Sequence, residues 1–276
     1  QNFNITVDAG GWEWLDHIVV QNIPESGTPY LLSADTSFDV HYHGQFEIYL
    51  YYGLNHITVY ANDSAGRSAT CSLDLYYDPY PPVIEFTYLP DGSYINEVPV
   101  EITWTFVEYM PFLRDAPLVD VYYRLEGPDW IRTENGSVVF PDLDDGCYYF
   151  QIKAVDAAGN IGMNGVNFTL DTCAPSLEIL TPSDGAIYSV DDVPLSIVAD
   201  DENSGLAGVQ YRLNGGTWTP LMSSSTTLAD LADNDYLLEV KAEDYAGNEN
   251  LTSVEFTVDT TAPVVTITSP ADGGYA

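Results

Sequence analysis

The residues of this chain that could do chemistry are mostly carboxylates, and some of them recur in one short pattern. The pattern reads Asp-x-Ala-Gly followed by Arg or Asn, and it starts at Asp63, Asp156 and Asp244. In such a string the Asp side chain caps a turn and the Gly supplies a positive φ, which is the ordinary structural role. Carboxylate oxygens are also the ligands that Ca²⁺ prefers. The pattern therefore predicts either turns alone or turns that also carry calcium ligands.

An excess of acid extends over the whole chain. The 276 residues include 42 Asp and Glu but only seven Lys and Arg, for a net charge of −35. Such a surface disfavours nucleic acid and anionic lipid, which proteins bind through Lys and Arg. The 21 Tyr, 10 Phe and five Trp are too many for a disordered chain. No apolar run approaches the roughly 18 residues of a membrane helix, so we expect a folded protein that attracts cations and does not itself insert into a membrane.

Three further markers keep step with the acidic pattern. Each pattern is followed at a fixed distance by an Asp, then a Pro, then an Asp-Gly pair. The Asp residues are Asp78, Asp171 and Asp259, and the Pro residues are Pro82, Pro175 and Pro263. The chain is therefore a tandem array, with steps of 93 and 88 residues between the patterns.

Apolar residues alternate with polar ones inside each repeat. Leu238, Val240 and Ala242 alternate with Glu239 and Lys241, as antiparallel strands require. A unit of roughly 90 residues with about seven such strands suits an immunoglobulin-like sandwich. We predict an all-β rod of three tandem sandwich domains: a divergent one at 1–79, then 80–173 and 174–261. Residues 262–276 would begin a fourth repeat, either cut off there or donated as a strand to a neighbouring molecule.

The motifs resemble a known class of repeats. Asp-x-Ala-Gly-Asn, Phe-Thr-Val-Asp-Thr-Thr-Ala-Pro and Ile-Thr-Ser-Pro-Ala-Asp-Gly look like the tandem bacterial and archaeal immunoglobulin-like (Big-type) repeats. The second and third repeats share the Tyr-Arg-Leu hairpin followed by Trp of one subtype, and the first has the Gly-x-Asn-x-Ile-Thr-Val strand of another. Such repeats occur in adhesins, surface-layer proteins and large secreted enzymes. The resemblance implies an extracellular, cell-surface setting and linkers stiffened by calcium.

In a sandwich of this type the Asp-x-Ala-Gly turn lies at the end that faces the preceding repeat. This would place Asp156 near the linker at Asp78, and Asp244 near the linker at Asp171. Acids of the third repeat's B–C loop would join the second linker. The predicted calcium ligands are thus Asp78, Asp156, Asp171, Asp200, Asp201, Glu202 and Asp244. We expect no organic cofactor.

The three cysteines predict one bridge. Cys147 and Cys173 lie almost equally far from the turn at Gly159, so they would face each other across two paired strands. A disulfide there would indicate an oxidising compartment; two unrelated thiols are the alternative. Cys71 has no partner in this arrangement and is expected to be a free thiol in the core; an intermolecular bridge is the alternative.

Five Asn-x-Ser/Thr sequons suggest a glycoprotein. They are Asn4, Asn62, Asn135, Asn167 and Asn250. Their modification depends on a host that has the pathway.

No motif of a known catalytic class occurs in the sequence, so we expect a protein that is not an enzyme. The preferred hypothesis is a structural protein of the cell surface: a stalk, a surface-layer component or a filament subunit. Its partners would be other copies of itself, other surface proteins or glycans. An adhesin module that binds a glycan or protein, or the spacer of a large secreted enzyme, are the alternatives.

Overall fold

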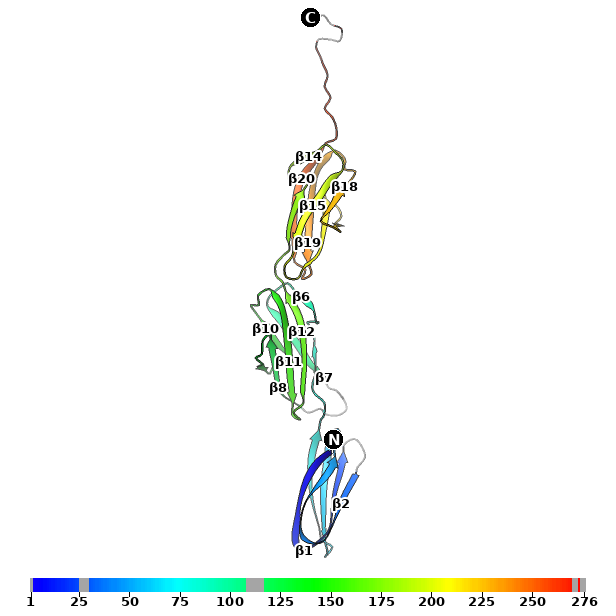
Figure 1. Cartoon of the computed structure of the whole chain (residues 1–276), viewed down its shortest axis with the longest axis vertical. Helices are drawn as coiled ribbons and strands as arrows, with labels where there is room; N and C mark the ends of the chain where they lie inside the picture. Colours follow the sequence, from blue (N-terminus) through cyan, green and yellow to red (C-terminus); the bar gives the residue numbers. More distant parts are fainter. Residues whose placement is uncertain (1, 25–29, 108–116, 270–272, 274–276) are drawn as a thin grey trace. The chain divides into compact units, whose positions relative to one another are not determined.

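The computed structural model confirms the all-β prediction. It describes all residues except 1, 25–29, 108–116, 270–272 and 274–276, and every regular element in the described part is a β-strand (Figure 1). The described part contains no helix that could cross a membrane.

The second and third repeats have the same strand order. In the second, the strands are β5 (Val83–Phe86), β6 (Ser93–Ile95), β7 (Val100–Val107), β8 (Leu118–Leu125), β9 (Ile131–Thr133), β10 (Ser137–Phe140), β11 (Gly146–Asp156) and β12 (Ile161–Leu170). In the third, they are β13 (Ser176–Thr181), β14 (Ala186–Tyr188), β15 (Val193–Asp200), β16 (Leu206–Leu213), β17 (Thr219–Pro220), β18 (Ser225–Leu228), β19 (Asn234–Asp244) and β20 (Glu249–Val258). The sheets run β5-β7-β10 with β6-β12-β11-β8-β9, and β13-β15-β18 with β14-β20-β19-β16-β17.

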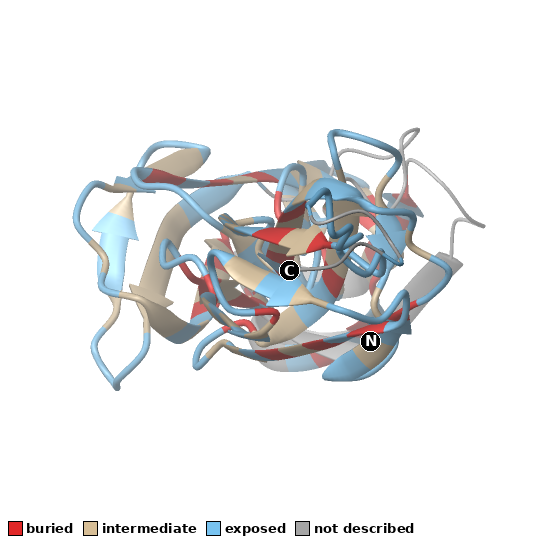
Figure 2. Ribbon diagram, turned by 90° about the horizontal axis from the view of Figure 1, so that it is seen from above, coloured by how far each residue is buried: buried red, intermediate tan, exposed pale blue. Residues whose placement is uncertain are grey.

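The period-two pattern explains the core of the third repeat. Successive side chains of a strand point to opposite faces, so Leu238, Val240 and Ala242 are fully buried while Glu239 and Lys241 are not. The alternation of buried and exposed residues along the strands is visible in Figure 2. Leu195 of β15 and Phe256 of β20 belong to the same apolar cluster, so the two sheets form a sandwich. Strand β19 ends, and β20 begins, at the acidic turn.

The first repeat is built differently. Its strands β1 (Asn2–Pro24), β2 (Tyr30–Tyr49), β3 (Gly53–Asp63) and β4 (Ser68–Tyr77) form one sheet in the order β2-β1-β3-β4. The register of β1 shifts between Gly10 and His17, and such irregularities bend a strand. Val7 and Val20, on either side of the shift, belong to one buried cluster. The sheet therefore encloses its core by folding over itself, where two separate sheets do so in the other repeats.

The domain limits stay a prediction. The three sets of strands lie within 2–77, 83–170 and 176–258, which agrees with the sequence repeats. The chain nevertheless divides into two compact units. One comprises Gln1–Tyr88, Ile102–Val138 and Phe150–Val166, and the other Leu89–Glu101, Val139–Tyr149 and Asn167–Ala276.

The strand expected after 262 does not form in the structure. Residues 261–268 have no ladder partner among the described residues, and Val264, Val265 and Ile267 are more than 80% exposed. A strand needs a neighbour for its backbone hydrogen bonds, which explains why this apolar stretch stays irregular here.

A buried asparagine organises the turn between β2 and β3. The Asn55 side chain is fully buried, and its Oδ1 accepts hydrogen bonds from the Tyr51 amide and Asn22 Nδ2, both at 3.0 Å. Its Nδ2 donates to the carbonyl oxygens of Tyr51 and Gly53, at 2.7 and 3.0 Å. The Gly-x-Asn motif of the first repeat is therefore a structural device that satisfies the backbone of a tight turn.

Replacing Asn55 by Ala should destabilise the first repeat by about 2–4 kcal/mol, because buried backbone groups would lose their partners. Chemical denaturation of the unglycosylated chain would measure this change. Asn62→Ala, the same substitution at an exposed position of the same strand, is the control and should change stability by less than about 0.5 kcal/mol. Equal losses for the two variants would contradict the assigned role.

Candidate functional site

The structural role predicted for the Asp-x-Ala-Gly pattern is confirmed. In the second repeat Asp156 Oδ1 accepts hydrogen bonds from the amides of Ala158 and Asn160, both at 2.9 Å, and Gly159 has φ of 88°. Asp63 and Asp244 accept equivalent bonds from Arg67 and Asn248. Each Asp thus caps the turn between two neighbouring strands.

The last residue of the pattern has a second role that the sequence reasoning missed. Asn160 Nδ2 donates to the backbone oxygen of Asp78 at 2.8 Å, and Asn248 Nδ2 donates to that of Asp171 at 2.7 Å. We call this pair of bonds the linker clamp, because each fastens the turn to the linker that enters its repeat. The signal was present in the sequence: Asn follows Gly in the two repeats with an incoming linker Asp, whereas the first repeat has Arg67.

The linker also passes close to the strand that follows each turn. At Gly162 a side chain would overlap the carbonyl group of Pro82. The corresponding residue of the third repeat is Asn250, whose Nδ2 donates to the carbonyl oxygen of Pro175 at 2.9 Å. The two linkers are therefore held along their backbones, by close approach in one case and by a hydrogen bond in the other.

Asp171 is the most buried of the linker acids, with no exposed surface. Its Oδ2 accepts a hydrogen bond from the Ser204 amide at 2.9 Å, and its Oδ1 accepts one from the Cys173 amide at 3.1 Å. Burial by itself would raise the pKa of this carboxyl, but the hydrogen bonds, chiefly those from Ser204, outweigh it and the pKa lies below its usual value. Asp171 is therefore an anion at neutral pH.

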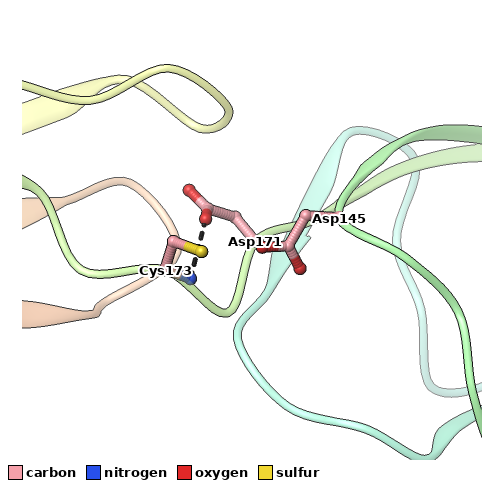
Figure 3. A group of neighbouring side chains, drawn as sticks. All are labelled: Asp145, Asp171 and Cys173. Carbon is pink, nitrogen blue, oxygen red and sulfur yellow. Dashed lines mark hydrogen bonds between the residues drawn. The ribbon is translucent and has the colours of Figure 1, made fainter.

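The same linker is fastened by an acid of the preceding turn. Asp145 Oδ1 accepts hydrogen bonds from the amide and the hydroxyl of Thr172, both at 3.0 Å. Figure 3 shows Asp145, Asp171 and Cys173 grouped at this linker. Hydrogen bonding to Asp145, together with the surrounding carboxylates, raises the pKa of the Cys173 thiol. The thiol form is a poor nucleophile.

Three of the predicted calcium ligands do come together. One carboxylate oxygen each from Asp171, Asp201 and Asp244 lies within 4.8 Å of the other two. Among the described residues, none of the three forms an ion pair with a basic side chain. A carboxylate has about four lone-pair positions on its two oxygens, and the hydrogen bonds found for Asp171, Asp201 and Asp244 occupy only part of them, so the residues fit a hard cation such as Ca²⁺.

The other predicted ligands are placed differently. Asp78 and Asp156 are buried at the first linker, but no third acid joins them among the residues that the structure describes. Asp200 and Glu202 are exposed and lie outside the cluster. Of these three neighbouring acids only Asp201 is not exposed, and its Oδ2 accepts a hydrogen bond from the Gly205 amide at 2.6 Å.

The predicted disulfide is wrong in this structure. Cys147 and Cys173 are free thiols. Cys71 is also free, but it is exposed and not in the core as predicted. The residue that faces Cys147 across β11 and β12 is Thr169, with 3.5 Å between Sγ and Oγ1. Strand β12 ends at Leu170, so Cys173 lies beyond the paired region. Counting residues from the turn placed the two cysteines at equal distances but overlooked where the strand stops.

The sequons differ in how their amides are used. Asn167 Nδ2 donates to Asp91 at 3.0 Å and Asn250 Nδ2 to Pro175. Asn62 and Asn135 are exposed, and the side chain of Asn4 lies outside the described part. Glycosylation at these sites stays a prediction.

The strand orders define the class of the second and third repeats as two-sheet β-sandwiches of immunoglobulin-like order. No family model matches the chain. It is 32% identical over 129 residues to chitinase A1 of Niallia circulans, a match that covers 43% of this chain and 18% of the chitinase.

Two further relatives match to a similar degree. Halomucin of Haloquadratum walsbyi is 30% identical over 119 residues, which is 41% of this chain and 1% of halomucin. Exoglucanase B of Cellulomonas fimi is 32% identical over 137 residues, covering 43% of this chain and 12% of that enzyme. The chain thus spans less than a fifth of the length of each relative.

Solved structures with a similar course of the chain have low sequence identity. Fibronectin(III)-like modules of CbhA from Clostridium thermocellum match with a TM-score of 0.41 and 13% identity, covering 64% of this chain and 94% of theirs. A tetra-tandem repeat from the extending region of a large adhesion protein matches with a TM-score of 0.33 and 17% identity, covering 94% of this chain and 75% of that one.

Replacing Asn248 by Ala should loosen the second linker, because the Asp171 carbonyl and the Asp244 carboxylate both lose a donor. We expect a loss of about 1–2 kcal/mol and faster hydrogen exchange at the Cys173 and Ser204 amides. Hydrogen exchange measured by mass spectrometry would report the local loss of stability and the faster exchange at these two amides. Arg67→Ala, at the same pattern position in the first repeat, should leave the exchange of those two amides unchanged; an equal effect would contradict a local clamp.

Asp171 should contribute to the acid sensitivity of the protein. Its folded-state pKa is lowered, so its stabilising contribution is full above about pH 4 and is lost as the pH falls through the folded-state value. Asp171→Asn should therefore lose stability at pH 7 and lose less on acidification than the parent chain. Thermal unfolding followed from about pH 7 to pH 2 tests this, and parallel curves for the two proteins would refute it.

Proposed function

We propose that this chain is a non-catalytic extracellular module whose function is to hold its repeats in series as part of a cell-surface stalk, surface layer or filament. The observation that carries the proposal is the linker clamp, which recurs with nearly equal geometry at Asp78 and Asp171. Hydrogen bonds to linker backbone restrict the φ and ψ angles that would otherwise let consecutive repeats swivel.

We further propose that calcium binds at Asp171, Asp201 and Asp244. Two of these carboxylates are buried, at 0% and 2% exposure for Asp171 and Asp244, and like charges at this spacing repel strongly where water is scarce. A divalent cation would offset that repulsion and tie the linker to two loops of the third repeat. When bound, the ion supplies charge and cross-linking, not catalysis.

A second candidate is supported by two of the relatives. Chitinase A1 and exoglucanase B carry their similarity to this chain within a small fraction of their length. The same repeats would then serve as a spacer within a larger secreted enzyme. An antibody against these repeats would capture the native protein, whose mass and polysaccharide hydrolysis can then be measured. A captured protein that hydrolyses polysaccharide and is much larger than this chain would favour the enzyme spacer, and one without hydrolytic activity would favour the structural module.

Calcium should raise the melting temperature of the chain and narrow its distribution of maximum dimensions in small-angle scattering. Asp201→Asn and Asp244→Asn should each weaken calcium binding, measured by titration calorimetry, by roughly tenfold or more. Asp200→Asn is the matched control, because that side chain is exposed and outside the cluster. Absence of calcium uptake by the parent chain would remove the metal from the proposal. Unchanged dimensions after Asn160 and Asn248 are both replaced by Ala would refute the proposal that the linker clamp holds the repeats in series.

A further inference from the structure

Some of the few positively charged side chains of this chain have carboxylate partners and others do not. Four of the seven form ion pairs with carboxylates: Arg67 with Asp63, Arg132 with Asp120, Arg212 with Glu239 and Lys241 with Glu249. Arg114 lies outside the described residues. Arg124 and Lys153, both in the second repeat, have no carboxylate partner in the described part of the chain.

These two cations lie together on one sheet face with two aromatic rings. The Arg124 guanidinium is 4.6 Å from the centre of the Trp130 ring, and Lys153 Nζ is 4.8 Å from the same ring and 4.5 Å from that of Tyr122. Residue pairing across β8 and β11 sets Gln151 opposite Arg124 and Lys153 opposite Tyr122. We call these five residues the cation–aromatic face.

In the third repeat the corresponding cationic side chains are neutralised by carboxylates. Arg212 and Lys241 correspond to Arg124 and Lys153, and Trp218 corresponds to Trp130. Arg212 binds Glu239 through two hydrogen bonds of 2.7 Å, and Lys241 binds Glu249 at 2.8 Å.

In the second repeat both acids are replaced by uncharged residues. Gln151 stands at the position of Glu239, and Ile161, which is 56% exposed, stands at that of Glu249. The same arrangement of Arg, Lys and Trp therefore has carboxylate partners in the third repeat and none in the second, within a chain of net charge −35.

We infer that the cation–aromatic face binds carboxylate side chains of a second copy of this chain. Arg and Lys form their strongest hydrogen bonds with carboxylates, and every copy presents them, since it has 42 Asp and Glu. Salt limits repulsion from the rest of the molecule to a range of about 8 Å at physiological ionic strength. The local pair of cations, and not the distant net charge, then decides what binds this face.

The geometry favours side-chain carboxylates over a sugar ring. A saccharide would need an uncovered ring face to stack on, but cations lie over both Trp130 and Tyr122. Lys153 Nζ donates no hydrogen bond to another described residue. Arg124 donates from its Nε to the Gln151 side chain and from one Nη to the Gly127 carbonyl oxygen. The remaining N–H groups are donors for the oxygens of an approaching acid. This inference requires neither calcium nor a surface location.

The experiment transplants the neutralising acids between repeats. The double variant Gln151→Glu with Ile161→Glu gives the second repeat the acids of the third, and should weaken self-association of the full chain by roughly tenfold. The reciprocal variant, Glu239→Gln with Glu249→Ile, frees Arg212 and Lys241 and should strengthen it. Sedimentation equilibrium at about 0.15 M salt measures both, and circular dichroism confirms that each variant is folded.

Three outcomes would overturn the inference. One is a parent chain that stays monomeric at all accessible concentrations; another is self-association that neither exchange alters. The third is a monomeric chain that binds polygalacturonate unless Gln151 and Ile161 are exchanged, since this would assign the face to an acidic polysaccharide. Arg67→Gln is the control for general charge effects: it removes one positive charge that is already paired with Asp63 in the first repeat, so it should change self-association far less than the first double variant.

Discussion

The hydrogen bond from a turn asparagine to the backbone of the incoming linker is the interaction on which the arrangement of this chain depends. A peptide group that leaves one sandwich and enters the next has no ladder to join, yet its polar atoms need partners. Asn160 and Asn248 supply the donors for Asp78 and Asp171. The turn aspartates hold these asparagines through their own carboxylates, so turn and linker form one hydrogen-bonded unit.

That unit also explains how so acidic a protein can bury carboxylates. Asp171 and Asp244 have almost no contact with water, and an isolated anion in such a place would be costly. Backbone amides of Cys173, Ser204 and Asn248 surround them instead. The structural role of these acids and a role in cation binding are therefore compatible, because amide donors organise the carboxylates and leave other lone pairs facing one another.

The second and third repeats have the same strand order and turns but differ in the side chains on their surfaces. The second and third repeats share strand order, turn geometry and a Trp beside an Arg and a Lys, and differ in whether acids neutralise those cations. The first repeat shares only the turn, and it encloses its core by bending one sheet where β1 changes register. Surface differences of this kind cost the fold little, since exposed ion pairs contribute at most about 1 kcal/mol each.

The sequence alone determined the fold class, the repeat and the role of its turns. Alternation such as that of Leu238 to Ala242 specifies a strand and its buried face, and Asp and Gly at fixed spacing specify the turn, because both effects are local. Tertiary structure alone decided which distant groups meet. It brought Asp201, and not Asp200 or Glu202, beside Asp171 and Asp244, and it set Thr169 opposite Cys147. Spacing along a chain predicts a face or a turn, but where a strand ends and which way a loop residue points depend on the packing of neighbours that the local sequence does not encode.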